Sequence, residues 1–183
     1  MSSLFCVPSI RSNTHTNHLS PSALLSGLLS PVWDSNARGT MVGITGYTTK
    51  AHICRATLEA VCYQTEAVLR AMAIESGVDV KELRVDGGMV NSDIAMQIQA
   101  DILGIRVSRP QMRESTALGS ALLAGAAKGL FGWKVSDPKT FEKVNAANRD
   151  HFDPKIPEEK RKKLIAGWDR AVERAKGWEQ EGQ

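Results

Sequence analysis

Residues 83–92, with the sequence LRVDGGMVNS, form the stretch of this chain with the clearest potential for chemistry. A β-compatible run ends in Asp86-Gly87-Gly88, and an apolar helical periodicity begins after Ser92. Glycine permits positive φ angles, and its lack of a Cβ lets a ligand lie directly on the backbone. The N–H groups at the start of the following helix can bind a phosphate or a purine edge. The stretch is therefore either a nucleotide-binding turn or only a tight strand-to-helix turn.

The common nucleotide-binding motifs do not decide between these two interpretations. Neither GxxxxGK[ST] nor GxGxxG occurs in the chain, so a P-loop and a Rossmann site lose their main support. Asp86 is expected to be structural, because a carboxylate at this position can accept hydrogen bonds from N–H groups of the turn. Ser92 is expected to cap the helix that follows.

The spacing of apolar residues around this turn predicts alternating strands and helices. The predicted strands are a short one within residues 39–47, and those at 83–88 and 105–110. The predicted helices are 51–76, ended by Gly77; 92–103, ended by Gly104; 116–129; and a last one after Pro157, with Leu164, Trp168, Ala171, Val172, Ala175 and Trp178 on one face. The small residues of 116–129 indicate a helix packed very close to its neighbour. The alternation predicts an α/β domain.

Residues 1–25 differ in composition from the rest. They are rich in Ser, Thr, Asn and Pro, and no Asp or Glu precedes Asp34. We expect a disordered or aberrant leader here, with the domain occupying residues 26–183. The segment lacks the features of a secretory signal, and no membrane span is expected. A cytoplasmic location is the default expectation, with mitochondrial association as the weaker alternative.

Charge and cysteine content exclude several classes of function. The net charge is only +3, and the basic run Lys160–Lys163 lies in a predicted helix, where it forms a solvated face. Binding to nucleic acid is therefore not expected. Cys6, Cys54 and Cys62 are odd in number and lack CxxC spacing, which argues against a disulfide framework and a zinc site.

Two longer stretches resemble a known family. Residues 86–125, DGGMVNSDIAMQIQADILGIRVSRPQMRESTALGSALLAG, are similar to the adenosine-binding segment of the FGGY carbohydrate kinases, and of the glycerol kinases within them. Residues 39–59, GTMVGITGYTTKAHICRATLE, resemble the second FGGY signature. The similarity extends from about Ser26 to the C-terminus, so the chain is identified as a C-terminal lobe of this family, truncated at its start.

The resemblance implies an actin-like ATPase fold of two ribonuclease-H-like lobes with ATP in the cleft between them. This chain is then a partial lobe, a short mixed sheet covered by helices. Family roles place Gly87 and Gly88 against the nucleotide, Gly88 through its backbone, and Ser92 where these kinases commonly have an Asn that contacts the nucleotide. The implied ligands are ATP or ADP, with glycerol and Mg²⁺ expected only in the complete kinase.

The family's phosphate loop, catalytic Asp and polyol-contacting residues are not found in this sequence. We therefore assign no catalytic and no metal-binding residue, and we expect the isolated chain to be an inactive part of an ATP:glycerol phosphotransferase. Two alternatives stay open: a non-catalytic module that pairs with a full-length kinase, and a small kinase with an unrecognised base. The strand near Met41–Thr45 is expected to present an unpaired edge and to promote self-association.

Overall fold

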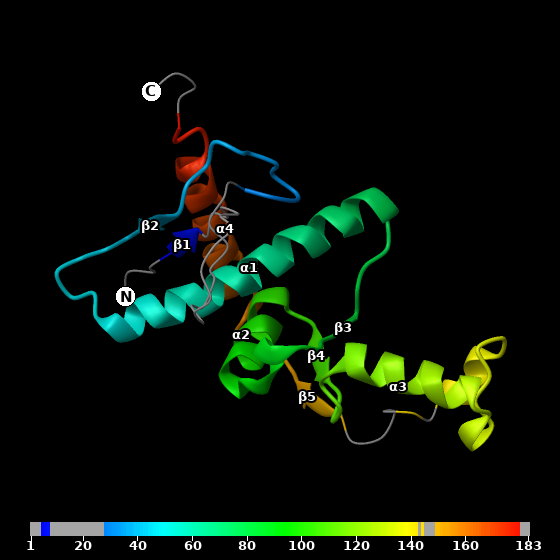
Figure 1. Cartoon of the computed structure of the whole chain (residues 1–183). Helices are drawn as coiled ribbons and strands as arrows, with labels where there is room; N and C mark the ends of the chain where they lie inside the picture. Colours follow the sequence, from blue (N-terminus) through cyan, green and yellow to red (C-terminus); the bar gives the residue numbers. More distant parts are fainter. Residues whose placement is uncertain (1–4, 8–27, 143, 145–148, 180–183) are drawn as a thin grey trace.

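The computed structural model describes residues 5–7, 28–142, 144 and 149–179 (Figure 1). The strands are β1 (Phe5–Val7), β2 (Thr40–Val42), β3 (Glu82–Arg84), β4 (Arg106–Arg109) and β5 (Asp150–Phe152). The helices are α1 (Lys50–Ser76), α2 (Asp93–Leu103), α3 (Ser115–Ala127) and α4 (Glu158–Ala175), with short 3₁₀ turns η1 (Gly88–Asn91), η2 (Leu130–Gly132) and η3 (Pro138–Phe141). None of the helices in this described part is long and apolar enough to cross a membrane.

The long helix α1 has a capping interaction at each end. The Thr49 hydroxyl accepts a hydrogen bond from the N–H of His52, and the His52 ring accepts from the N–H of Thr49. At the other end Gly77 takes the left-handed conformation, with φ of 67°, which residues with a Cβ resist. The predicted helix 51–76 is therefore confirmed. Gly104 ends α2 in the same way, as the sequence predicts.

The main sheet is short and mixed. Its strand order is β3-β4-β5, with β3 parallel to β4 and β5 antiparallel to β4. Val107 at the centre of the sheet lies between Leu83 and Phe152 in the two registers. The two predicted strands are confirmed, whereas β5 was not predicted because Asp150, His151 and Phe152 carry no hydrophobic run.

The pairing of β2 corrects two sequence-based expectations. β2 does not join the main sheet; it pairs antiparallel with β1, with Cys6 opposite Met41. The strand near Met41 therefore has a neighbour, and residues 5–7 are not a disordered leader. The short run Phe5-Cys6-Val7 is β-compatible, but the polar composition around it hid this signal. The rest of the predicted leader, residues 8–25, lies outside the described residues.

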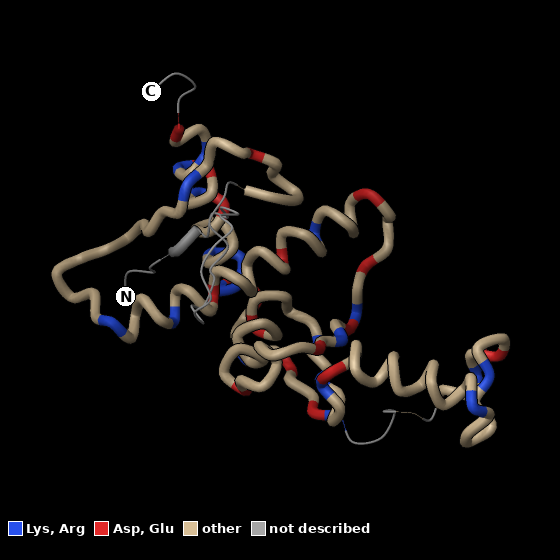
Figure 2. Tube along the Cα trace, viewed as in Figure 1, with Lys and Arg blue, Asp and Glu red and all other residues tan. Residues whose placement is uncertain are grey.

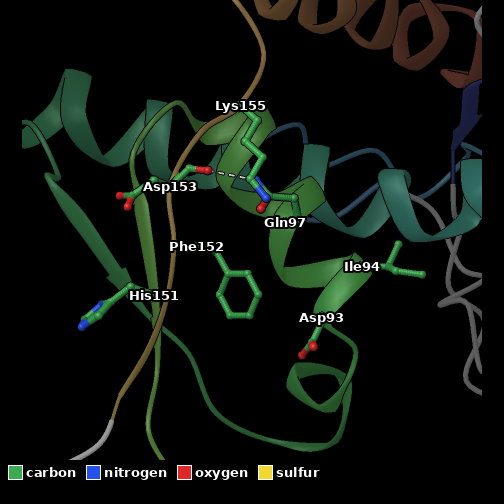
Figure 3. A pocket seen from close by; sticks show the side chains of 7 residues that line it. All are labelled: Asp93, Ile94, Gln97, His151, Phe152, Asp153 and Lys155. Carbon is green, nitrogen blue, oxygen red and sulfur yellow. Dashed lines mark hydrogen bonds between the residues drawn. The ribbon is translucent and has the colours of Figure 1, made fainter.

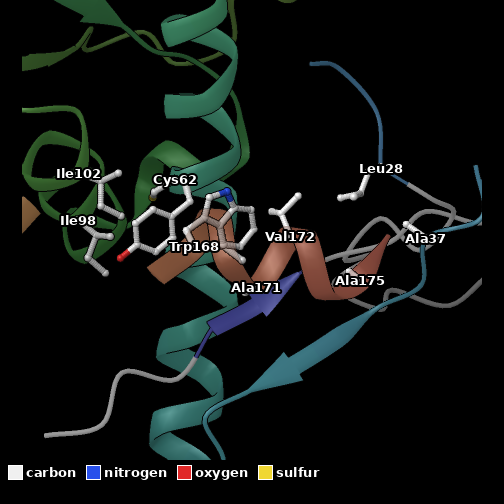
Figure 4. Packing of buried hydrophobic residues seen from close by; sticks show 11 residues of the cluster. Leu28, Ala37, Cys62, Ile98, Ile102, Trp168, Ala171, Val172 and Ala175 are labelled. Carbon is white, nitrogen blue, oxygen red and sulfur yellow. The ribbon is translucent and has the colours of Figure 1, made fainter. Parts of the chain in front are cut away.

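Two hydrophobic clusters hold the elements together, and α2 contributes to both. The first lies where α1, α2 and α4 meet: Leu28, Ala37, Ala60, Cys62, Tyr63, Ile98, Ile102, Trp168, Ala171, Val172 and Ala175. Figure 4 shows Trp168 beside Cys62 in this cluster, and the Trp168 ring stacks on Tyr63 with centroids 5.3 Å apart. The second cluster lies between α2 and the sheet: Val90, Ala95, Met96, Ala100 and Val107.

The last helix ends earlier than its apolar pattern predicts. α4 stops at Ala175, and Gly177 then turns the chain with φ of 58° while its N–H donates to the Asp34 carboxylate at 2.8 Å. Trp178 was predicted on the buried face, but this turn directs it away and leaves it 67% exposed. The five other apolar residues of the predicted face are buried or half-buried.

The helix α3 corrects a further expectation. The small residues of this segment predicted close packing against a neighbour, but in the described structure only Gly125 of α3 is buried. A Cβ at Gly125 would come within 2.7 Å of the Trp133 ring, so the glycine does admit a close contact there. The rest of α3 extends away from the sheet (Figure 1). The small-residue pattern therefore indicates a helix suited to close packing, but most of α3 has no packing partner among the described residues.

Replacing Trp168 with Ala is expected to lower the free energy of unfolding by about 3–5 kcal/mol, the usual cost of removing a buried aromatic ring. Trp168 is 1% exposed and stacks on Tyr63. Urea denaturation followed by circular dichroism measures the change. Trp178→Ala is the matched control, since its exposed ring should cost under about 0.5 kcal/mol. Equal losses for the two variants would contradict the packing described here.

Candidate functional site

The strand-to-helix turn at Gly87 and Gly88 is held by backbone hydrogen bonds. The N–H of Val85 donates to Ser108 at 3.1 Å and continues the parallel pairing past the end of β3. Gly87 then turns the chain with φ of 93°, and its N–H donates to the carbonyl of Arg113 at 3.0 Å. The chain enters η1 and passes through Ser92 into α2. The predicted turn is thus present between β3 and α2.

The two glycines of the turn have different structural roles. A Cβ placed on either Gly87 or Gly88 meets no atom within 4 Å, so both have open space beside them. The φ of Gly87 lies in the left-handed region, which explains the glycine by backbone conformation. Gly88 is exposed and has no such positive φ, so neither packing nor backbone strain in the described structure requires a glycine there.

Ser92 caps α2, as its residue type predicts. Its hydroxyl oxygen accepts a hydrogen bond from the N–H of Ala95 at 3.3 Å. The Ser92 side chain is half-buried, and its O–H can still donate to a further acceptor. Capping therefore explains why a serine stands here, and it leaves one donor at the edge of the turn.

The expected role of Asp86 is not observed. Asp86 is exposed, and no hydrogen bond to its carboxylate occurs among the described residues. The carbonyl of Arg113 accepts the Gly87 N–H instead. The turn is therefore stabilised by a backbone group from the segment after β4, a long-range partner that local sequence reasoning could not identify.

Three charged residues that the sequence analysis did not single out interact next to the turn. Arg109 at the end of β4 donates to Asp150 of β5 at 2.6 Å and pairs with Asp93 of α2 at 2.8 Å. These hydrogen bonds from Arg109 lower the pKa of the Asp150 carboxyl below its ordinary value. A charged residue just before Pro110, inside a predicted strand, was the available signal. Within the described residues no three His, Cys, Asp or Glu side chains gather to hold a metal ion.

An open pocket lies between the N-terminal half of α2 and the β5 segment (Figure 3). Its volume is about 500 Å³, and it is lined by Asp93, Ile94, Gln97, His151, Phe152, Asp153 and Lys155. The Gln97 amide donates to the carbonyl of Asp153 at 2.9 Å across one end of it. Gly87, Gly88 and Ser92 do not line this pocket. The predicted site is therefore an exposed turn, with one wall in the described structure.

Comparison with known proteins identifies the family. Residues 7–128 match the C-terminal domain of the FGGY family of carbohydrate kinases, a match that starts before the expected domain start at residue 26. Glycerol kinase of Deinococcus radiodurans is 52% identical over 157 residues, 86% of this chain and 30% of that protein. Glycerol kinase of Petrotoga mobilis is 51% identical over 156 residues, 85% of this chain and 30% of that protein.

A solved structure agrees with this result. The crystal structure of Plasmodium falciparum glycerol kinase with ADP matches with a TM-score of 0.75 and 29% identity, covering 95% of this chain and 31% of that one. The expected fold class, a partial α/β lobe of the actin-like ATPase type with a short mixed sheet, is confirmed. The chain spans about 30% of the length of the relatives it matches. With residues 7–128 matching its C-terminal domain, the chain belongs to the FGGY family of carbohydrate kinases.

Proposed function

We propose that this chain supplies the adenosine-binding wall of an ATP:glycerol phosphotransferase, which converts glycerol to glycerol 3-phosphate. The observation that carries the proposal is the open turn before the N-terminus of α2, where Gly88 is exposed and a Cβ would meet no atom within 4 Å. It lies in a chain 52% identical to a glycerol kinase over 157 residues. An adenine nucleotide is the ligand that the family suggests for this open backbone. The proposed enzyme acts in the cytoplasm.

The described residues suit the adenosine end of ATP or ADP better than its phosphates. A flat base or a ribose can lie on the exposed Gly88 backbone, and the Ser92 O–H can donate to it. Carboxylates able to hold Mg²⁺ do not gather within the described part of the chain. In the proposed enzyme, Mg²⁺, the phosphates and glycerol are therefore held outside the described turn, and Gly87, Gly88 and Ser92 position the adenosine.

The variant Gly88→Ala tests this assignment. A methyl group at Gly88 meets no protein atom within 4 Å, so the melting temperature should stay unchanged. The same methyl group would occupy the space of a base lying on the backbone, and affinity for adenosine should fall about tenfold or more, which is about 1.4 kcal/mol. Titration calorimetry with adenosine, ADP and ATP measures both the loss and the expected similarity of the three ligands.

Gly46→Ala is the matched control, because a Cβ there also meets nothing within 4 Å and Gly46 lies outside the turn. It should bind adenosine like the unmodified chain. Equal affinity of the Gly88 and Gly46 variants would contradict the proposed site. A strong Mg²⁺-dependent preference for ATP over ADP would show that phosphate ligands exist elsewhere in the chain.

The 183-residue chain on its own is expected not to phosphorylate glycerol. Phosphoryl transfer needs a base within hydrogen-bond reach of the attacking hydroxyl and cations around the transferred group. Near the turn, Asp93 and Asp150 are instead paired with Arg109. An assay of ADP release, with and without glycerol, should give equal rates. ADP formation that requires glycerol and disappears in Gly88→Val would overturn this expectation.

A second candidate function, binding to another polypeptide, is favoured by α3. From Ser115 to Ala127 the helix has no charged residue, and Figure 2 shows it bounded by charges only at its ends. Leu123 is 59% exposed, and Phe131 just beyond the helix is 79% exposed. Uncharged exposed surface of this kind marks association sites. We propose that α3 pairs with a second copy of this chain, since a net charge of +3 gives little repulsion.

The variant Leu123→Glu should therefore reduce self-association, because it places a charge in the middle of the uncharged helix face. Sedimentation velocity across a range of protein concentrations is expected to show a shift towards monomer. Ile74→Glu is the control, since Ile74 is 79% exposed but lies at the end of the charged helix α1. A chain that is already monomeric at all concentrations would contradict pairing between copies. Co-purification with a full-length kinase, lost in the Leu123 variant, would assign α3 to that partner instead.

A further inference from the structure

Arg109 is the most buried charged side chain near the turn. It is 5% exposed, and its guanidinium group contacts three different elements. One nitrogen, Nη1, donates to the carbonyl of Val90 in η1 at 2.7 Å and pairs with Asp93 of α2 at 2.8 Å. Nε and Nη2 both donate to Asp150 of β5, at 3.0 and 2.6 Å. The group thus ties the turn, the helix after it and the edge of the sheet to β4.

Burial of a positive charge is unfavourable unless the charge is paired and hydrogen-bonded. Burial lowers the pKa of Arg109, but the hydrogen bonds to Asp150 and Asp93 outweigh burial, and the pKa lies above its ordinary value. The guanidinium also lies over the Phe152 ring, 5.1 Å from its centroid. Arg109 is therefore charged, satisfied and fixed in position.

Arg113 holds the same turn at two other points. Its Nη1 donates to the Asn91 side-chain oxygen at 2.6 Å, and its backbone carbonyl accepts the N–H of Gly87 at 3.0 Å. Between these contacts, Gly88 is left exposed with open space beside it. The two arginines therefore restrain the turn from behind and leave the face of Gly88 accessible.

We infer that Arg109 is a positioning residue for the adenosine-binding turn: it holds the Val90 carbonyl and Asp93 so that the Gly88 backbone is presented to the ligand in a single conformation. The inference rests on the proposed function for its ligand. A planar guanidinium is required, because only its fork of N–H groups reaches Val90, Asp93 and Asp150 together. A lysine would keep the charge and lose most of these hydrogen bonds. Arg109 touches no ligand itself; it acts through the turn.

The test compares Arg109→Lys with Arg106→Lys in the full chain. Arg106 is the matched control: it lies on the same strand and pairs with Asp153 at 2.8 Å, but it makes no hydrogen bond to the turn. Amide hydrogen exchange, followed by NMR without ligand, reports on the N–H groups of Val90 and Ser92, which donate within the turn. Arg109→Lys should speed exchange of these two amides about tenfold and leave buried amides of α1 unchanged, because the opening is local. Arg106→Lys should leave both sets unchanged.

Adenosine titration of the same variants supplies the second readout. Affinity should fall for Arg109→Lys in step with the faster exchange and stay constant for Arg106→Lys. Unchanged exchange in the turn overturns the inference, and so does faster exchange with unchanged affinity. If the unmodified chain binds no adenosine, the proposed function fails, while the exchange data still decide whether Arg109 orders the turn.

A variant that loosens the whole fold would speed exchange in α1 as well. In that case Asp93→Asn provides the decisive measurement, since it weakens one contact of Arg109 at an exposed side chain and leaves the core intact. Exchange of the Val90 and Ser92 amides should then rise about threefold with α1 unchanged, as expected for a local effect. No change in the turn for this variant would overturn the inference.

Discussion

The packing of α2 on two hydrophobic clusters at once is the constraint on which the rest of the structure depends. Ile98 and Ile102 on one side of α2 join the cluster with α1 and α4, while Ala95, Met96 and Ala100 on the other side pack on the sheet. A helix with two buried faces can neither rotate nor slide without exposing apolar area. Its N-terminus, and the turn that leads into it, are therefore fixed relative to both halves of the fold.

Hydrogen bonds within these clusters help to define how α1 and α2 are aligned. The buried Gln99 amide donates to the carbonyl of Cys62 at 3.2 Å, and the Cys62 thiol donates to the carbonyl of Ala95 at 3.8 Å. Burial raises the pKa of the Cys62 thiol to about 12, so the group stays protonated and able to donate. Because hydrogen bonds require defined geometry, these contacts set the register of α1 against α2 where apolar packing alone would tolerate small shifts.

The described structure combines a well-buried centre with surfaces that are incompletely covered. Trp168, Tyr63 and Val107 are fully buried, yet α3 and the apolar residues that follow it are mostly exposed. The chain spans about 30% of the length of the glycerol kinases it matches. A turn with one wall and an uncharged exposed helix are consistent with a lobe that works against further protein surface.

Much of the local structure was determined by the sequence itself. Apolar periodicity and the glycines at 77 and 104 predicted α1 and α2 to within one residue, since capping depends only on neighbouring residues. The Gly87-Gly88 turn and the Ser92 cap were predictable for the same reason. The family was predictable because two long stretches of the sequence resemble it. Only the tertiary structure distinguished the two glycines of the turn: Gly87 has a positive φ and Gly88 does not. Residue types alone do not give φ angles or the space beside a backbone atom.

Contacts between distant residues were likewise decided only by the tertiary structure. Three features each join segments that are far apart in the chain: the pairing of β1 with β2, the pairing of β5 with β4, and the hydrogen bond from Gly177 to Asp34 just after the end of α4. Arg109 is the clearest case: its partners come from η1, α2 and β5, and none lies within ten residues of it. Short strands and single charged residues carry little local signal, because their stability comes from the partners that folding brings to them.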